Sequence, residues 1–182
     1  MKKLALAVLA IGVLAASVAS AASYEGKWGT TVLDQGHPLG LTFGLGKTAA
    51  VDLGLGFHTQ KFPAGAFADS GTKLAWDAKV KVRTAVVEAD NANLTLGAFF
   101  SYGQEPTGAL DGTGNAVKIK NMSVGAEIGG EYWLSNLISI HAAHGIAWMS
   151  NKTGDADALT SFASTGDVFG NAGITLWFGG RK

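Results

Sequence analysis

The feature that most constrains the fold of this chain is an alternation of apolar and polar residues with a period of two. In segment 72–84, the apolar side chains share one face of an extended chain: Leu74, Trp76, Ala78, Val80 and Val82. The charged side chains share the opposite face: Lys73, Asp77, Lys79, Lys81 and Arg83. A strand places successive side chains on opposite faces, so this pattern predicts a β-strand with one apolar and one charged face.

The alternation recurs in eight segments, separated by turn-forming residues: 26–33, 39–46, 50–58, 72–84, 93–102, 116–133, 137–148 and 167–178. Segment 137–148 also fits one face of a helix, but the β-branched residues Ile138, Ile140 and Ile146 favour an extended chain. Glycine is abundant (26 residues) and proline is rare (3 residues), which suits curved strands better than helices. The sequence therefore predicts eight antiparallel strands.

The connections between these segments alternate in length. Long connections are expected at 59–71, 103–115 and 149–166, and short ones at 47–49, 88–92 and 134–136; the first connection, 34–38, is also short. Short turns on one side and long loops on the other are typical of outer-membrane β-barrels.

Charged residues recur on the polar faces of the expected strands: Asp52, Asp77, Lys79, Lys81, Arg83, Glu127 and Glu131. In a membrane barrel these faces line a narrow lumen, where enclosed charges must be paired. Asp52 and Arg83 lie near the same end of neighbouring strands, so we expect them to meet. In a soluble barrel the same residues would face water, and the alternation alone leaves that alternative open.

The N-terminal segment predicts a removable signal peptide. Lys2 and Lys3 precede the apolar run 4–16, and Ala19-Ser20-Ala21 offers the small residues of a cleavage site. We expect cleavage after Ala21, a signal peptide over 1–21 and one barrel domain over 22–182.

The composition excludes two other classes of protein. The chain has no cysteine, which excludes a disulfide-stapled scaffold, and its 14 basic and 14 acidic residues lack the basic excess of a nucleic-acid binder.

Aromatic residues lie mostly near the ends of the expected strands: Trp28, Trp76, Tyr102, Tyr132, Trp133, Trp148 and Trp177. Aromatic girdles at the two membrane interfaces occupy such positions in outer-membrane barrels.

The last expected strand carries a family resemblance. Its sequence NAGITLWF resembles the β-signal of outer-membrane proteins, with matches at Asn171, Gly173, Leu176 and Phe178, although the trailing GGRK departs from members that end on the final aromatic. The mature chain as a whole resembles the small barrels of the outer membrane protein A transmembrane domain and outer membrane protein X type. The resemblance implies an all-β, eight-stranded, antiparallel up-and-down transmembrane β-barrel in the outer membrane of a Gram-negative bacterium.

The resemblance also implies the surroundings of the protein: outer-membrane lipid, lipopolysaccharide, and the barrel-assembly machinery, which would recognise the last strand. We expect a structural or surface-interaction role, a lumen largely filled by side chains, and no enzymatic activity, cofactor, metal or nucleic acid. Three alternatives stay open. They are a narrow pore for small solutes, a lipid A-modifying enzyme using Ser139 and His141, and a soluble lipocalin-like protein, whose first-strand motif resembles Gly26-Lys27-Trp28.

Overall fold

The fold is known from a computed structural model that describes residues 23–32, 39–64, 70–165 and 171–180. These residues form nine strands: β1 (Lys27–Val32), β2 (Leu39–Gly44), β3 (Ala49–Phe62), β4 (Gly71–Glu88), β5 (Ala92–Leu110), β6 (Ala116–Ser135), β7 (Ile138–Thr153), β8 (Leu159–Thr165) and β9 (Asn171–Gly179). Within the described ranges there is no helix with the length and apolar character that a membrane span requires. The expected signal peptide, the connection 34–38 and the side chain of Asn171 lie outside what is described.

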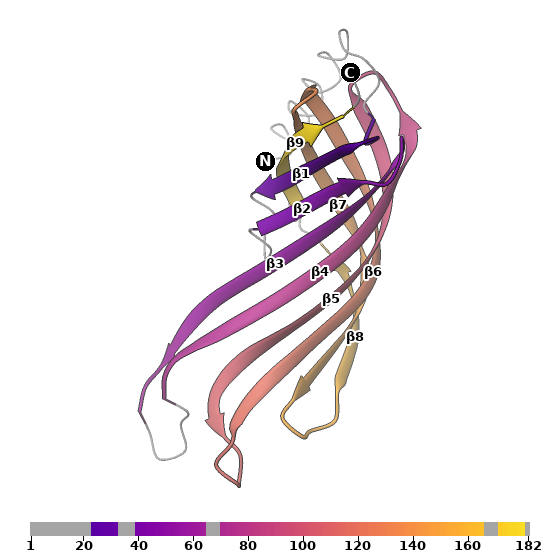
Figure 1. Ribbon diagram of the computed structural model, residues 1–182. Coiled ribbons are helices and arrows are strands. Elements are labelled where there is room, and N and C mark those ends of the chain that lie inside the picture. The colour runs from indigo at the N-terminus through magenta and orange to yellow at the C-terminus, as the bar shows by residue number, and fades with distance from the viewer. Residues whose placement is uncertain (1–22, 33–38, 65–69, 166–170, 181–182) are drawn as a thin grey trace, which may run out of the picture.

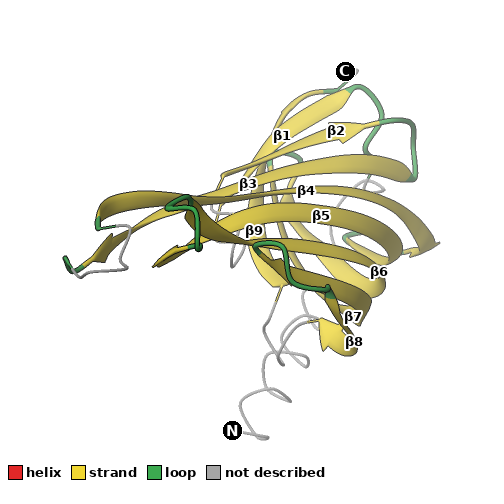
Figure 2. Cartoon of the chain, turned by 90° about the horizontal axis from the view of Figure 1, so that it is seen from below, coloured by secondary structure: helices red, strands yellow, loops and turns green. Residues whose placement is uncertain are grey.

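The strands close into an antiparallel ring. Each strand from β1 to β7 pairs with the next one along the chain, and β9 pairs with both β7 and β1 (Figures 1 and 2). The predicted all-β, antiparallel ring of eight strands is therefore confirmed. The eighth place is shared by two strands, because β8 pairs with residues 145–151 of β7 and β9 pairs with residues 138–143.

The register fixes the tilt of the strands. Starting at Ile138 and stepping through directly paired residues around the ring leads back to β7 at Trp148, ten residues further along. The steps pass through Leu176, Thr30, Leu41, Leu53, Val80, Phe100 and Val124. With about 4.8 Å between strands and about 3.3 Å per residue, this stagger corresponds to a tilt of about 40° from the ring axis.

The connections differ from the prediction on one side of the ring. The short turns are present at 45–48, 89–91 and 136–137, and we call this side the turn end. The long loops expected at 103–115 and 149–166 are wrong, because most of their residues belong to the strands β5 to β8. In the loop expected at 59–71, residues 59–62 extend β3 and Gly71 begins β4, whereas 65–69 lie outside the described residues. Backbone pairing such as Gln104↔Lys120 carries the strands onward after the apolar alternation has stopped. We call the side with these extended hairpins the hairpin end.

The ring is taller on one side than on the other. β4, β5 and β6 contain 18, 19 and 20 residues, whereas β1 and β2 contain 6 each. Figure 1 shows the long strands reaching far past β1 and β2 toward the hairpin end. Of the last predicted strand, 167–178, residues 167–170 lie outside the described residues, and β9 spans Asn171–Gly179.

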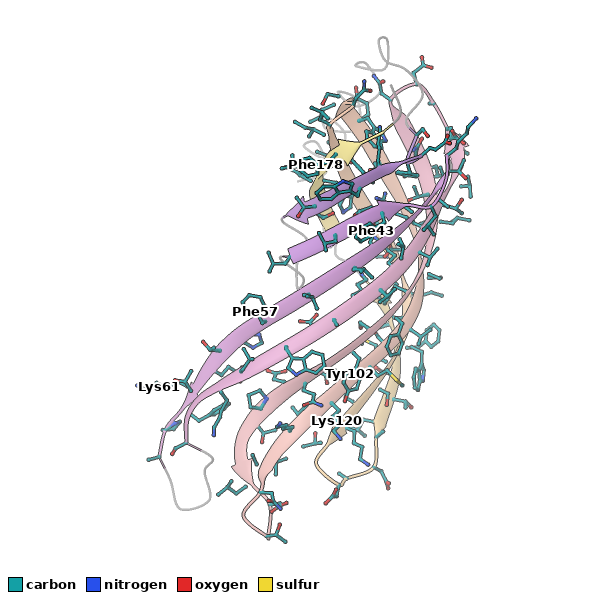
Figure 3. The ribbon with its side chains drawn as sticks, in the orientation of Figure 1. Phe43, Phe57, Lys61, Tyr102, Lys120 and Phe178 are labelled. Atoms are coloured by element: carbon teal, nitrogen blue, oxygen red, sulfur yellow. The ribbon has the colours of Figure 1, made fainter. Side chains whose placement is uncertain are left out.

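The two faces of the wall have opposite chemistry. On β4, Val80 and Val82 point outward and are 45% and 50% exposed, whereas Lys81 and Arg83 point into the ring and are 8% and 5% exposed. Figure 3 shows side chains such as Phe43, Phe57 and Phe178 on the outside of the wall. The greasy side of each alternating segment is thus the outer surface of the ring.

The aromatic prediction is partly wrong. Trp28, Trp76 and Trp148 are outward and exposed, but Trp133 and Trp177 are buried inside the ring at 4% and 1% exposure. The alternation explains this result, because Trp177 lies between the outward residues Leu176 and Phe178. Tyr132 and Trp133 are consecutive residues of one strand, so they cannot both belong to a girdle on the outer surface.

Candidate functional site

An ion-pair network fills the interior of the ring near the turn end. Arg83 on β4 stands between two carboxylates, with Nη1 2.8 Å from Glu131 Oε2 and Nε 3.0 Å from Asp52 Oδ2. The residue after Lys81 on the inner face of β4 is Arg83, so the strand period of two presents two cations to the same interior. Asp52 is directly opposite Lys81 on β3.

Lys81 extends the network toward the hairpin end. Its Nζ lies 2.8 Å from Glu127 Oε1 and 3.4 Å from Asp52 Oδ2. Glu127 has a glycine directly opposite it on each neighbouring strand, Gly97 on β5 and Gly145 on β7. A Cβ atom at Gly145 would lie 2.8 Å from the Cα and Cβ of Glu127, and one at Gly97 would lie 3.2 Å from its Cγ. The two glycines therefore make room for the carboxylate in the narrow interior.

The structure brings together five of the seven charged residues that the sequence pattern selected: Asp52, Lys81, Arg83, Glu127 and Glu131. The other two, Asp77 and Lys79, lie further along β4 and are half-buried. Lys79 Nζ lies 4.5 Å from the centre of the Phe99 ring, which is itself buried. Neither residue belongs to the four ion pairs of the network.

Glu131 is also bound by neutral groups that the sequence reasoning missed. The Tyr24 hydroxyl and Arg83 Nη1 both donate to Oε2, and Ser139 Oγ donates to Oε1 at 2.6 Å. Ser139 in turn accepts a hydrogen bond from Trp177 Nε1 at 2.8 Å. Glu131 is thus fully buried and accepts hydrogen bonds at both of its oxygens from three residues, Tyr24, Arg83 and Ser139.

An aromatic cluster closes the turn end below Glu131. Tyr24, Trp133 and Trp177 are buried together with Ala50, and the Trp133 and Trp177 rings stack with centroids 5.1 Å apart. The Tyr24 ring lies 5.7 Å from Trp177 and 6.1 Å from Trp133. We call these four residues the aromatic floor. Tyr24 precedes β1 and belongs to no alternating segment, so no sequence signal identified it.

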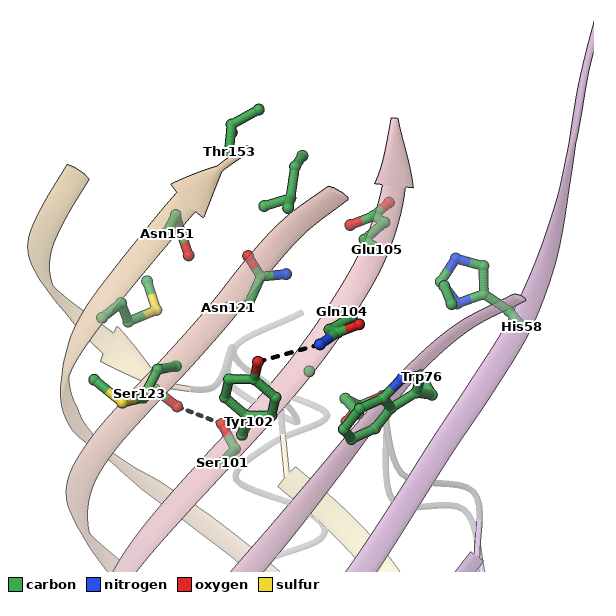
Figure 4. Close-up of a pocket in the computed structure, with 16 residues that line it drawn as sticks. His58, Trp76, Ser101, Tyr102, Gln104, Glu105, Asn121, Ser123, Asn151 and Thr153 are labelled. Atoms are coloured by element: carbon green, nitrogen blue, oxygen red, sulfur yellow. Dashed lines mark hydrogen bonds between the residues drawn. The ribbon is translucent and has the colours of Figure 1, made fainter. Parts of the chain in front are cut away.

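A cavity of about 620 Å³ lies on the inner face toward the hairpin end (Figure 4). Polar side chains from several strands reach it, including His58, Asp77, Glu105, Asn121 and Asn151. The hydroxyls of Ser101 and Ser123 are 2.6 Å apart across β5 and β6. The cavity lies beyond Lys79 and Phe99, so the ion-pair network and the aromatic floor separate it from the turn end.

The two residues considered for catalysis point into the interior but do not form a nucleophile–base pair. Ser139 is fully buried and its hydroxyl donates to Glu131. His141 is the next inward residue on β7 and stands against Gly173 on β9, where a Cβ atom would lie 2.8 Å from its Cε1. The hydroxyl proton of Ser139 is thus directed at a carboxylate rather than at the imidazole.

The residues of the resemblance to a β-signal occupy one short strand. Asn171 begins β9, and Gly173 faces inward against His141. Leu176 and Phe178 are outward and exposed, and Phe178 packs on Trp28 with ring centroids 4.7 Å apart. Comparison of the chain with family models, with curated proteins and with solved structures finds no match.

Proposed function

We propose that the chain is an outer-membrane β-barrel protein with a structural or surface-interaction role and a closed lumen. The observation that carries the proposal is the distribution of side chains on β4, where exposed Val80 and Val82 alternate with buried Lys81 and Arg83. A protein folded in water buries its apolar face and solvates its charges, whereas lipid favours the reverse arrangement. On this proposal the plan is similar to that of the small outer membrane protein A and X barrels.

The dimensions of the apolar surface support this environment. Outward aromatic residues lie near the turn end, as Trp28 and Phe178, and again near the level of Trp76, Tyr102 and Trp148. Ile138 and Trp148 mark these two levels on β7 and are ten residues apart, as the register shows. At a tilt of about 40°, ten residues span about 25 Å, which is the height of the apolar band in outer-membrane barrels.

Orientation follows from the asymmetry of the ring. Short turns face the periplasm and long connections face outward in such barrels. The turn end would therefore face the periplasm and the extended hairpins β3–β4, β5–β6 and β7–β8 would project outside. Segment 1–21 would act as the signal peptide for export, and β9 would be the strand that the barrel-assembly machinery recognises.

The filled interior supports a closed barrel rather than a pore. Four ion pairs and the aromatic floor occupy the interior between the turn end and the cavity. Moving ions through this region would require charges to separate in a poorly hydrated space. The hairpin end, with its polar cavity, would be the part that meets other molecules, because loops on a rigid scaffold carry recognition.

The soluble, lipocalin-like alternative is disfavoured by Trp28, which belongs to the motif that suggested it. Trp28, in the motif Gly26-Lys27-Trp28, is 49% exposed and packs on the outer surface against Phe178. In a soluble barrel this large side chain would be expected on the inner, apolar face. The enzymatic alternative is disfavoured because the Ser139 hydroxyl donates its hydrogen bond to Glu131 and not to His141.

Cell fractionation followed by gel electrophoresis with and without boiling tests the proposal. We expect the protein in the outer-membrane fraction, and we expect unboiled samples to migrate differently because a closed barrel resists detergent. Planar-bilayer recordings of the same sample should show no large, stable conductance. A chain that stays dissolved and folded without detergent would refute the membrane assignment, and large stable channels would refute the closed lumen.

A further inference from the structure

Three lysines stand together on the outer surface of the wall, just beyond the apolar band. Lys118 and Lys120 alternate along β6 with inward residues such as Ile119, and Lys152 lies on the same outer face of β7. Lys120 and Lys152 are directly opposite each other in the β6–β7 pairing. All three side chains are exposed. We call these three residues the lysine patch.

No acidic side chain in the described ranges forms an ion pair with the lysine patch. Side chains directly opposite each other on antiparallel strands have Cβ atoms about 5 Å apart, and like charges in such positions repel. The neighbouring outward residue on β5 is Gln104, whose side-chain amide donates to the Tyr102 hydroxyl. Among the residues that the structure describes, no carboxylate thus forms an ion pair that would offset the repulsion between Lys120 and Lys152.

The lysine patch lies next to the apolar outer surface of β6 and β7, and this position limits which anionic ligand could bind to it. Moving along β7 away from the turn end, Trp148 comes first and Lys152 follows four residues later. On β6 the order is Val124, Met122 and Lys120, all on the outer face. Figure 3 labels Tyr102 and Lys120 on the neighbouring strands β5 and β6. A ligand that contacts these outward residues of β6 and β7 would have an apolar part against Val124 and Trp148 and an anionic part at the lysine patch.

We propose that the lysine patch binds the phosphate groups of a lipid headgroup in the outer leaflet, with the acyl chains lying against the apolar surface of β6 and β7. The inference rests on the proposed function, because it needs the hairpin end to face the outside. Lysine suits this role, since its long apolar stem lies along the wall while the ammonium group reaches the headgroup level. Phosphorylated lipid A is the lipid of that leaflet with the required chemistry.

The chain offers a matched control. Lys61 on β3 is also exposed and outward near the hairpin end, but its directly paired residue on β4 is Thr72. It has the same charge and is likewise exposed on the outer face, without a second lysine opposite it. Replacing Lys61 changes the net charge as much as replacing Lys120 does, so it separates the patch from a general effect of charge.

Native mass spectrometry of the detergent-solubilised barrel with lipid A tests the proposal. A lysine that contacts an anionic headgroup strengthens binding about fivefold, so K120Q and K152Q should each weaken lipid A binding by about that factor. The double variant should weaken it about 25-fold, whereas K61Q should leave it unchanged. Lipid A without phosphates should bind the wild-type barrel as weakly as phosphorylated lipid A binds the double variant. Inorganic phosphate should not displace the lipid.

Three outcomes would overturn the proposal: equal lipid A binding by the double variant, an equal loss in K61Q, or displacement of lipid A by inorganic phosphate. The gel shift on boiling reports separately whether each variant forms a barrel. A normal gel shift with unchanged lipid A binding would refute the lysine patch and leave the proposed function intact. Loss of the gel shift in the wild-type protein would refute the proposed function itself.

Discussion

Arg83 Nη1 lies 2.8 Å from Glu131 Oε2 inside the ring, and the two side chains are only 5% and 0% exposed. The pair joins β4 to β6 across the interior. The same glutamate oxygen also accepts a hydrogen bond from the Tyr24 hydroxyl. An enclosed charge that loses its partner has neither water nor a counter-charge. The stability of the barrel should therefore depend on keeping both members or replacing both.

Replacing Arg83 alone tests this dependence. R83A should lower the free energy of unfolding by about 3–5 kcal/mol, because Glu131 and Asp52 are left enclosed without their cation. The measurement is urea unfolding of the barrel in lipid vesicles. The double variant R83A/E131A should lose less than the sum of the two single variants, since it removes both charges of the pair.

K61A is the control for this series, because Lys61 is exposed and should change the stability by less than about 0.5 kcal/mol. An unchanged unfolding midpoint in R83A would show that the ion pair contributes nothing to the barrel.

Gly145 provides a test of the close packing around Glu127. In G145A the added Cβ would lie 2.1 Å from the Ala126 carbonyl oxygen and 2.8 Å from the Cα of Glu127, so the wall must shift. Overpacking of this kind should cost about 1–3 kcal/mol in the same urea assay. Gly130 is the matched control on the outer face of β6, because no atom lies within 4 Å of an added Cβ there. Equal stability of G145A and G130A would contradict the inward placement of Gly145.

The β5–β6 hairpin predicts a local pH dependence. Hydrogen bonds from the Thr113 side chain and from the backbone N–H groups of Asn115 and Thr113 lower the pKa of the Asp111 carboxyl to about 2. A lowered pKa means that the carboxylate stabilises the turn above its ordinary pKa of about 4 and that this stabilisation is lost as the pH falls through about 2.

The amide proton shifts of Thr113 and Asn115, followed by NMR in micelles, should accordingly titrate near pH 2. In D111N they should not titrate in this range. A midpoint near 4 in the wild-type protein would mean that the turn does not hold the carboxylate in this way.

The faces of the strands were predictable from the sequence because they depend only on alternation. Lys81 and Arg83 were placed opposite Val80 and Val82 by their spacing, and the ring keeps that division. The ends of the strands were not predictable in the same way. From Gly103 to Leu110 the chain has no apolar alternation, yet backbone hydrogen bonds to β6 hold it extended through Pro106. Pairing of this kind leaves no mark in the side-chain pattern.

The partners of Glu131 show a second limit. Tyr24 donates directly to Glu131, whereas Trp177 is linked to it through Ser139 on the neighbouring strand β7. Tyr24 and Trp177 lie near opposite ends of the described chain, and the closure of the ring brings β9 beside β1 and β7. Asp52 and Arg83 could be expected to meet, since they lie on neighbouring strands. A hydrogen bond across the interior depends on the stagger of the whole ring, which no local pattern records.

The most direct test of the account is a spin-label scan of β5 in lipid vesicles. The natural chain has no cysteine, so single cysteines can be placed at outward Leu94, Leu96 and Phe100 and at inward Thr95 and Phe99. We predict that collisions with oxygen, which concentrates in hydrocarbon, are frequent at the three outward positions and rare at the two inward positions. Frequent collisions at Thr95 and Phe99 instead, or access of a water-soluble relaxation agent to Leu94, Leu96 and Phe100, would contradict a barrel with lipid outside and charges within.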